Sequence, residues 1–163
     1  MMVGIGYDIH TLVPRRQLFL GGVQIDFPKG LAGHSDGDVL IHAICDALLG
    51  AANLGDIGRH FPPDDDRYKN ISSLKLLKSV NKFLKNTGYM VKHIDTVVIA
   101  EAPKILPYIE EMKSTIANAI DISSDAISIK GKTNEGMGEI GQGKAIAAWA
   151  VCLLGRIYAT PER

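Results

Sequence analysis

Residues 33–42 read GHSDGDVLIH, a polar loop that runs directly into an apolar segment. Ser35 is followed three residues later by Asp38, which is the spacing of a capping box and predicts that a helix begins here. His42 lies inside this predicted helix. A loop this rich in glycine, aspartate and histidine is poor material for a hydrophobic core, so we expect it to form part of a polar site.

A second short stretch, GYDIH at residues 6–10, follows an apolar run and places Asp8 and His10 two residues apart. Side chains at this spacing point to the same side of an extended strand. With His42 they offer one carboxylate and two imidazoles, the ligand set of an open catalytic zinc site. The spacing also occurs by chance, and a plain turn with an N-cap would explain the serine and the second aspartate of the loop. That alternative leaves the histidines unexplained as a group.

Composition limits the classes of function. The chain has 163 residues, 46% hydrophobic and 22% charged, which suits one domain with a substantial core, here expected over residues 1–163. Lys plus Arg and Asp plus Glu both number 18, which argues against binding of nucleic acid or an anionic membrane through a global field. No stretch approaches the roughly 18 apolar residues of a membrane span. There is no signal-peptide pattern, so we expect a cytoplasmic location, and we expect Cys45 and Cys152 to be buried thiols.

The order of patterns predicts an α/β (α+β) two-layer sandwich with a mixed four-stranded sheet, a small hairpin, and helices packed on one face. A glycine pair between two apolar triplets marks the hairpin. We expect strands at residues 2–7, 18–20, 23–25, 94–100 and 126–130, helices at 36–52, 72–87, 103–120 and from about 143 to Tyr158, and turns or loops at 27–30, 53–69 and 131–138.

Several polar positions lie near the candidate metal ligands or at the ends of predicted strands. Asp46 is four residues after His42 on the same helix face, so it could accept the second ring N–H of that histidine and fix its tautomer. His34 lies at a helix start, where free N–H groups suit an anion. Residues 132–135 follow a strand, and residues 100–104 join a strand to a helix with small side chains that would let a flat group lie against the backbone.

Taken together, the motifs resemble the 2-C-methyl-D-erythritol 2,4-cyclodiphosphate synthase family. The match follows nearly the whole chain in order, and the combination of HSDGDV with an upstream Asp-x-His is highly specific. The motifs are GYDIH at 6–10, HSDGDV at 34–39, DALLGA at 46–51, GDIG at 55–58, FP at 61–62, APK at 102–104 and TNE at 133–135.

The resemblance implies a homotrimer with active sites between neighbouring subunits. It implies a zinc ion held by Asp8, His10 and His42, and a second divalent ion, Mg²⁺ or Mn²⁺, held by Glu135 and the substrate phosphates. His34 and Thr133 would position or stabilise the reacting phosphate. The substrate-binding residues would be Asp8, Ile9, His10, His34, Ser35, Asp56, Ile57, Gly58, Phe61, Asp65, Ala100, Pro103, Lys104, Ile105, Leu106, Gly131, Lys132, Thr133, Asn134 and Glu135, with Asp56 to Gly58 on the methylerythritol part and residues 100–106 on cytosine.

The implied activity is that of a phosphorus–oxygen lyase in the non-mevalonate (MEP) pathway of isoprenoid precursors. It would convert 4-diphosphocytidyl-2-C-methyl-D-erythritol 2-phosphate to the 2,4-cyclodiphosphate and release CMP. A zinc phosphohydrolase with the same three ligands is a second hypothesis. A binding protein with a structural zinc is a third, although three visible ligands and no suitably placed cysteine argue against a closed site.

The chain departs from the family pattern at the positions linked there to an isoprenoid diphosphate on the trimer axis. Related chains often carry an aromatic residue and an arginine where this chain has Glu139 and Gln142. Replacing an apolar residue by an acid, and a cation by a neutral group, disfavours that ligand. Lys132 stands where threonine is common, and a phosphate contact and a solvent-facing lysine are both open.

Overall fold

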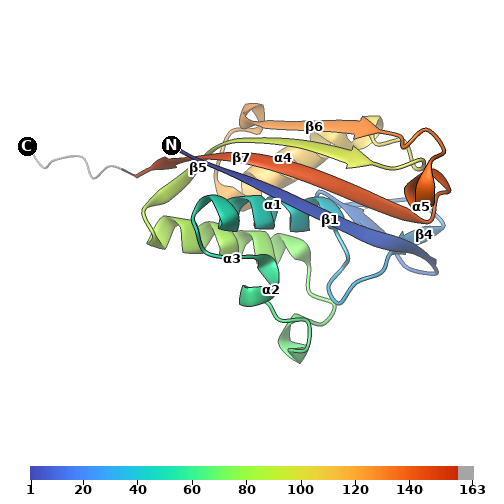
Figure 1. Cartoon of the computed structure of the whole chain (residues 1–163), viewed down its shortest axis with the longest axis horizontal. Helices are drawn as coiled ribbons and strands as arrows, with labels where there is room; N and C mark the ends of the chain where they lie inside the picture. Colours follow the sequence, from blue (N-terminus) through green and yellow to red (C-terminus); the bar gives the residue numbers. More distant parts are fainter. Residues whose placement is uncertain (158–163) are drawn as a thin grey trace, which may run out of the picture.

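The computed structural model describes residues 1–157, in which one layer is a mixed sheet and the other is formed by helices (Figure 1). The main sheet has five strands in the order β4-β1-β7-β5-β6. The strands are β1 (Met2–Pro14), β4 (Lys29–Leu31), β5 (Tyr89–Ile99), β6 (Ile127–Lys132) and β7 (Ala145–Arg156). Only the β5–β6 pair is parallel among the pairs of this sheet. The predicted fold class is confirmed, with the three-residue strand β4 added at the edge of β1.

The remaining elements cover one side of this sheet or connect its strands. The predicted hairpin forms a separate two-stranded sheet of β2 (Leu18–Leu20) and β3 (Val23–Ile25). None of the helices in residues 1–157 has the length and apolar character needed to cross a membrane. The helices are α1 (Val39–Ala51), α2 (Ile57–His60), α3 (Ser73–Asn86), α4 (Ile109–Ile120) and α5 (Gly138–Gly141), with 3-10 turns at Asp66–Tyr68, Leu106–Tyr108 and Ser124–Ala126.

Helix α1 is the centre of the core because it lies between the sheet and α3. Its side chains are apolar on nearly every side, and Leu40, Ile44 and Leu48 are completely buried. Burial of each such side chain contributes about 1.5–3 kcal/mol. Glycine in β1 lets the helix approach closely, since a Cβ added at Gly4 would lie only 2.0 Å from the carbonyl oxygen of Ala47.

The start of α1 is tied to the hairpin by one buried carboxylate. Asp38 is the N-cap residue and accepts the N–H of Ile41 at 3.0 Å. It also accepts the N–H groups of Gly21 and Gly22, at 3.0 and 2.6 Å. Both glycines have positive φ, 59° and 77°, as a tight two-residue hairpin turn requires. The cap is therefore Asp38 rather than Ser35, and the helix begins at Val39 rather than at residue 36.

The prediction of a helix in the C-terminal segment is wrong, because this segment is the strand β7. Ala148, Ala150 and Cys152 are buried, whereas Trp149 and Val151 between them are 41% and 43% exposed. The alternation has the period of a strand, but both sets of side chains are apolar, so hydropathy did not separate the two faces. The predicted end of that helix near Tyr158 lies outside the described residues.

Several other boundaries also differ from the prediction, and among them β5 begins at Tyr89 rather than at residue 94. β1 continues beyond Tyr7 to Pro14, so Asp8 and His10 lie within a strand and not at its end. Residues 29–31 pair with β1 instead of forming only a turn. The helix predicted over residues 103–120 is α4, which begins only at Ile109, after a 3-10 turn that contains Pro107. Proline cannot donate a backbone hydrogen bond inside a helix.

The side of the sheet opposite the helices exposes an apolar patch. On β1 this patch includes Val3, Ile5 and Tyr7, which are 68%, 64% and 42% exposed. It continues on β7 with Trp149 and Val151, and the rings of Tyr7 and Trp149 pack with centroids 4.5 Å apart. We call these five residues the outer-face patch.

Candidate metal centre and active site

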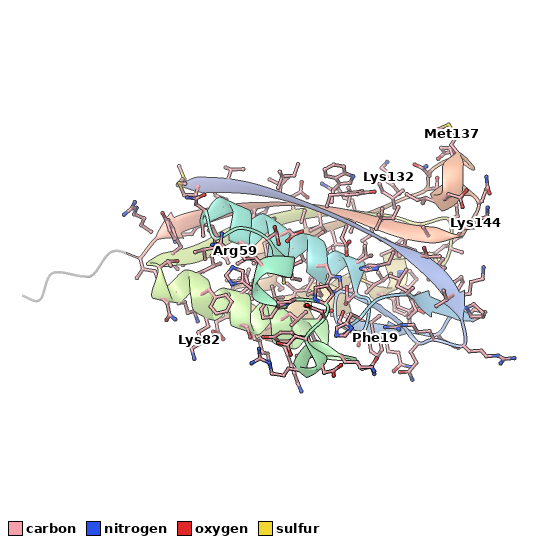
Figure 2. All side chains as sticks on the ribbon, turned by 60° about the horizontal axis from the view of Figure 1, so that its bottom comes forward. Phe19, Arg59, Lys82, Lys132, Met137 and Lys144 are labelled. Carbon is pink, nitrogen blue, oxygen red and sulfur yellow. The ribbon has the colours of Figure 1, made fainter. Side chains whose placement is uncertain are left out.

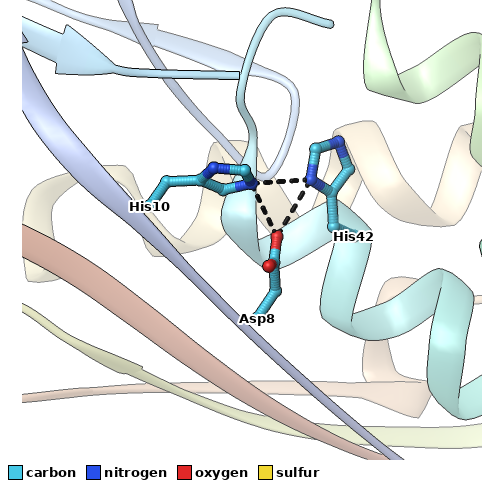
Figure 3. Close-up of side chains that lie close together, drawn as sticks. All are labelled: Asp8, His10 and His42. Atoms are coloured by element: carbon cyan, nitrogen blue, oxygen red, sulfur yellow. Dashed lines mark hydrogen bonds and ion pairs between the residues drawn. The ribbon is translucent and has the colours of Figure 1, made fainter. Parts of the chain in front are cut away.

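The structure brings together the predicted metal ligands of β1 and α1 (Figure 3). Asp8 Oδ2 lies 2.8 Å from His10 Nε2 and 3.0 Å from His42 Nδ1, and the two imidazole nitrogens are 3.1 Å apart. Ligand atoms about 2.0–2.1 Å from a tetrahedral zinc ion stand roughly 3.4 Å from one another. A small outward adjustment of these side chains would therefore accommodate a divalent ion, and all three side chains line a cavity.

The electrostatics of the group also suit a cation. Burial opposes ionisation of Asp8, but hydrogen bonds and charge from His10 and His42 outweigh it and hold the pKa of this carboxyl well below its usual range. Burial alone would lower the pKa of the His42 imidazole, yet the hydrogen bond and charge of Asp8 raise it above its ordinary value. Nearby Asp36 and Asp38 add to this rise. Asp8 thus stays ionised, and the three acids favour positive charge at the position of the His42 ring.

Asp46 is not the hydrogen-bond partner of His42, so that hypothesis is wrong. The Asp46 carboxylate accepts the backbone N–H of Ile57 at 2.7 Å and thereby holds the start of α2 against α1. Burial raises the pKa of Asp46, and the nearby charge of Asp56 adds to the rise. The second ring nitrogen of His42 instead faces the hydroxyl groups of Ser35 and Ser73.

A cavity opens directly from Asp8, His10 and His42, which we call the metal group. Its wall contains many of the residues expected at the substrate, together with aromatic and apolar side chains from the loop after α2. His34 donates from Nε2 to the carbonyl oxygen of Asp65 at 3.3 Å, which links the polar loop to the opposite wall. We call this the metal cavity, and it is lined by Asp8, His10, His34, Ser35, His42, Asp46, Ile57, Gly58, Phe61, Pro63, Tyr68, Ile71 and Leu76.

A second cavity contains most of the remaining predicted residues. It lies where the ends of β5 and β6 meet the segment leading into α4. Figure 2 shows Lys132, one of its residues, far from Arg59, which lies on α2 beside the metal cavity. We call it the strand-end cavity, and it is lined by Ala100, Glu101, Pro103, Lys104, Ile105, Leu106, Ile109, Gly131, Lys132 and Thr133.

The turn after β6 arranges the predicted catalytic threonine beside the predicted ligand of a second metal. Thr133 Oγ1 donates to Glu135 Oε1 at 2.6 Å. The turn is anchored by Glu101, whose Oε1 accepts the backbone N–H of Asn134 at 2.7 Å. Glu135 lies outside the group of Asp8, His10 and His42. One chain therefore presents the two sets of predicted catalytic residues in different places.

Three predicted substrate residues have other contacts within this chain. The side chain of Ile9 is 43% exposed and lines a different cavity, while its N–H donates to Asp8. The Asp56 carboxylate caps α2 through the N–H of Arg59. Asp65 pairs with Arg67 at 2.6 Å, and this partner holds the pKa of the exposed Asp65 carboxyl low.

Sequence reasoning missed two polar residues of this region, Ser73 and Glu101. The only signal for Ser73 was its position at the start of a predicted helix, which does not indicate a contact with His42. Glu101 was recognised as part of a strand-to-helix junction but received no role. Both act through contacts across the fold, at separations of 31 and 33 residues along the chain.

Comparisons with known proteins agree with this geometry. A model of the YgbB family matches residues 1–155. The 2-C-methyl-D-erythritol 2,4-cyclodiphosphate synthase of Clostridium acetobutylicum is 56% identical over 94% of this chain and 99% of that protein. The bifunctional IspDF from Campylobacter jejuni matches with a TM-score of 0.92 and 39% identity over 95% of this chain, which spans 42% of that chain. IspF of Plasmodium falciparum, solved as a CDP complex, matches with a TM-score of 0.85 and 35% identity over 96% of this chain and 97% of that one.

Proposed function

The chain belongs to the YgbB family, and from this premise we propose its reaction. It is an enzyme, a phosphorus–oxygen lyase that converts 4-diphosphocytidyl-2-C-methyl-D-erythritol 2-phosphate to 2-C-methyl-D-erythritol 2,4-cyclodiphosphate and releases CMP in the MEP pathway. The observation that carries the conclusion is the identity of more than half of the residues with a synthase of this name along almost its full length. We propose that residues 1–163 act as one catalytic domain.

We propose that Asp8, His10 and His42 hold a zinc ion. The convergence of one carboxylate and two imidazole nitrogens supports this ligand set. When bound, zinc would act as a Lewis acid that stabilises negative charge on a phosphate oxygen. A second ion, Mg²⁺ or Mn²⁺, would bind Glu135 together with the substrate phosphates, and the hydrogen bond from Thr133 would orient that carboxylate.

The protein's own residues would act mainly by positioning. The 2-phosphate of the substrate is already an anion, so its attack on the β-phosphorus needs no strong protein base. The difficulty is to bring two anionic groups together and to stabilise the charge in transit. We propose that His34, in the metal cavity, and Thr133, at the strand-end cavity, hold the reacting phosphates from opposite sides.

The other substrate contacts follow the two cavities. In the metal cavity, Ile57 and Gly58 would hold the methylerythritol part. In the strand-end cavity, Ala100 to Leu106 would bind cytosine mainly through backbone groups, because the segment is rich in small residues. The relative solved as a CDP complex supports a cytidine nucleotide as the ligand class.

We propose that the active protein is a homotrimer with its sites between subunits. Thr133 and the metal group line different cavities of one chain, although a single reaction needs both. The outer-face patch supplies an apolar surface on which a second copy could pack, since exposed apolar patches of this kind mark interaction sites. A neighbouring subunit could then bring its strand-end cavity to the metal cavity.

Product analysis tests the proposed reaction. With zinc, Mg²⁺ and the diphosphocytidyl substrate, we expect equimolar CMP and cyclic diphosphate, whereas a zinc phosphohydrolase would produce a ring-opened hydrolysis product.

His42→Ala should lower CMP release by about a thousandfold or more, because several kcal/mol of charge stabilisation is lost with the metal. His93→Ala is the control, since His93 is exposed on β5. Near-normal turnover by a metal-free His42→Ala protein would contradict this mechanism.

A further inference from the structure

The far side of the His42 ring is enclosed by two serine hydroxyls. In Figure 3, one ring nitrogen faces Asp8 and the other points away from it. That second nitrogen, Nε2, lies 2.9 Å from Ser73 Oγ and 3.0 Å from Ser35 Oγ. Ser73 is completely buried and Ser35 is 7% exposed, so these hydroxyls take the place of water around Nε2.

The direction of these hydrogen bonds follows from the next group, Asp36. Ser73 Oγ donates its proton to Asp36 Oδ1, because an ionised carboxylate can only accept. The other oxygen of Asp36 accepts the backbone N–H of Ser73 at 2.8 Å, which fixes the carboxylate in place. A hydroxyl has one proton, so toward the imidazole Ser73 can only accept.

The proton on the ring must therefore be on Nε2. A neutral imidazole carries a single N–H, so the lone pair is on Nδ1, the atom that faces Asp8 and His10. We propose that Ser73 and Asp36 are positioning residues that hold His42 in its metal-binding tautomer. This inference rests on the metal role proposed above, and it assigns a role to two residues for which that proposal has none.

Ser35 alone cannot impose the same tautomer. Its hydroxyl oxygen accepts the N–H of Gly37 at 3.2 Å, and its proton is free to point either to Ser73 Oγ, 3.4 Å away, or to His42 Nε2. If Ser73 is removed, Ser35 can donate to Nε2 as well as accept from it. Both tautomers then become accessible, and the one with its proton on Nδ1 cannot bind the metal.

The first test measures zinc affinity in Ser73→Ala by competition with a chelator. Loss of such a supporting contact weakens metal affinity about 10- to 100-fold, and we expect a loss of at least about tenfold. The melting temperature of the zinc-free protein should change little, because alanine keeps the N–H that Asp36 accepts. Ser79→Ala is the control, since Ser79 is partly exposed on the same helix and donates to the carbonyl of Lys75. Equal zinc affinity in the two variants would overturn the proposal.

The second test reads the tautomer directly. In long-range ¹H–¹⁵N spectra of the zinc-free protein at alkaline pH, where the imidazole is neutral, we expect the His42 proton on Nε2. In Ser73→Ala the fraction with the proton on Nδ1 should rise, which a purely structural role of Ser73 would not cause. A wild-type ring that carries its proton mainly on Nδ1 would also overturn the proposal.

These readouts are independent of the proposed reaction, because neither uses the substrate. If the wild-type protein binds zinc and shows the Nε2–H tautomer but releases no CMP, the proposed role of Ser73 and Asp36 is supported and the proposed reaction is wrong. If Ser73→Ala binds zinc as tightly as the wild type and releases CMP, the proposed role of Ser73 and Asp36 is wrong and the proposed reaction is supported.

Discussion

The metal group depends on two local regularities that converge in space. Asp8 and His10 share a face because alternate residues of a strand point the same way. His42 faces them because Asp38 caps α1 and sets the start of the helix one turn earlier. The resulting triangle of ligand atoms has sides of 2.8 to 3.1 Å. Spacing predicted its members, and folding brought them together.

The raised pKa of His42 predicts how zinc binding changes with pH. In the metal-free protein the charged imidazole stabilises the fold. This contribution is complete below the unfolded-state pKa of about 6.5 and is lost as pH rises through the higher folded-state pKa. Zinc binds the neutral ring and must displace this proton at low pH. We expect zinc affinity to rise with pH until the pH passes the raised folded-state pKa of His42, by up to roughly tenfold per pH unit while the ring still carries its proton.

Chelator competition at several pH values measures this dependence, with a chelator whose own proton equilibria are known. The depressed pKa of Asp8 keeps that ligand ionised throughout the range, so the slope does not report this carboxylate. An affinity that does not change with pH would contradict the assignment of His42 as a ligand that must lose a proton.

At the scale of elements, the packing of α1 on the sheet decides whether the metal group can form. The helix rests on β1 at two glycines, and at Gly6 an added Cβ would lie 2.0 Å from the carbonyl oxygen of Ala43. Alanine or any larger residue would push the helix away from the strand. Since His42 is on the helix and Asp8 is on the strand, this contact sets both the stability of the core and the distance between ligands.

Gly4→Ala should therefore lower the free energy of unfolding by at least about 3 kcal/mol, the upper end of the usual cost of overpacking, because the clash is with backbone. Denaturant unfolding measures the change. Gly50→Ala, on the exposed face of α1 with no atom within 4 Å of the new methyl group, should instead stabilise by about 0.5–1 kcal/mol. Equal effects of the two substitutions would show that the close approach is unimportant.

The contact between α1 and α2 predicts a separate effect on substrate binding. Asp46 holds the N–H of Ile57, and a hydrogen bond to a charged group contributes about 1.5–3 kcal/mol. Asp46→Ala should raise KM about tenfold or more and leave the zinc content unchanged, because the metal group does not use this carboxylate. Glu111→Ala, an exposed acid on α4, is the control. Loss of zinc with an unchanged KM would contradict this role of Asp46 in the contact between α1 and α2.

At the scale of the whole molecule, the important feature is the separation of the two cavities. The metal cavity and the strand-end cavity lie at different parts of one chain, and each contains residues to which we assign a part in the proposed reaction. Gly4 and Gly6 of β1 face α1, so the alternating residues of the outer-face patch lie on the opposite side of the sheet. A closed symmetric oligomer would bury this patch and repeat the same interface at each subunit.

Mixing two inactive variants tests whether the site lies between subunits. His42→Ala removes a metal ligand and Thr133→Ala removes the hydroxyl at the strand-end cavity, and each alone should be nearly inactive. After dissociation and reassembly of a 1:1 mixture, about a quarter of the sites should combine an intact half from each variant, because each half is intact in half of the subunits. CMP release near a quarter of the wild-type rate is the expected result. Absence of recovery, with mixed oligomers confirmed by mass spectrometry, would place the complete site within one chain.

The sequence by itself determined most of the elements and the three residues that meet in the candidate metal group. Helical and strand periods are local properties, and the Asp-x-His pair and the glycine turn each have a geometry that neighbouring residues fix. The C-terminal strand could not be predicted from hydropathy. Trp149 and Val151 are apolar although they are exposed, so the sequence does not show their alternation with buried residues.

Only the tertiary structure decided which polar groups meet. Asp46 shares a helix face with His42, yet its carboxylate accepts the N–H of Ile57. The second ring nitrogen of His42 instead contacts Ser73, which is distant in sequence. The same holds for the two cavities: residues between Asp8 and Leu76 line the first and residues between Ala100 and Thr133 line the second, and only the fold shows that the two lie apart. The physical reason is that side-chain partners are chosen by how helices and strands pack, and that packing is fixed by steric contacts such as Gly4 with Ala47, which no local pattern encodes.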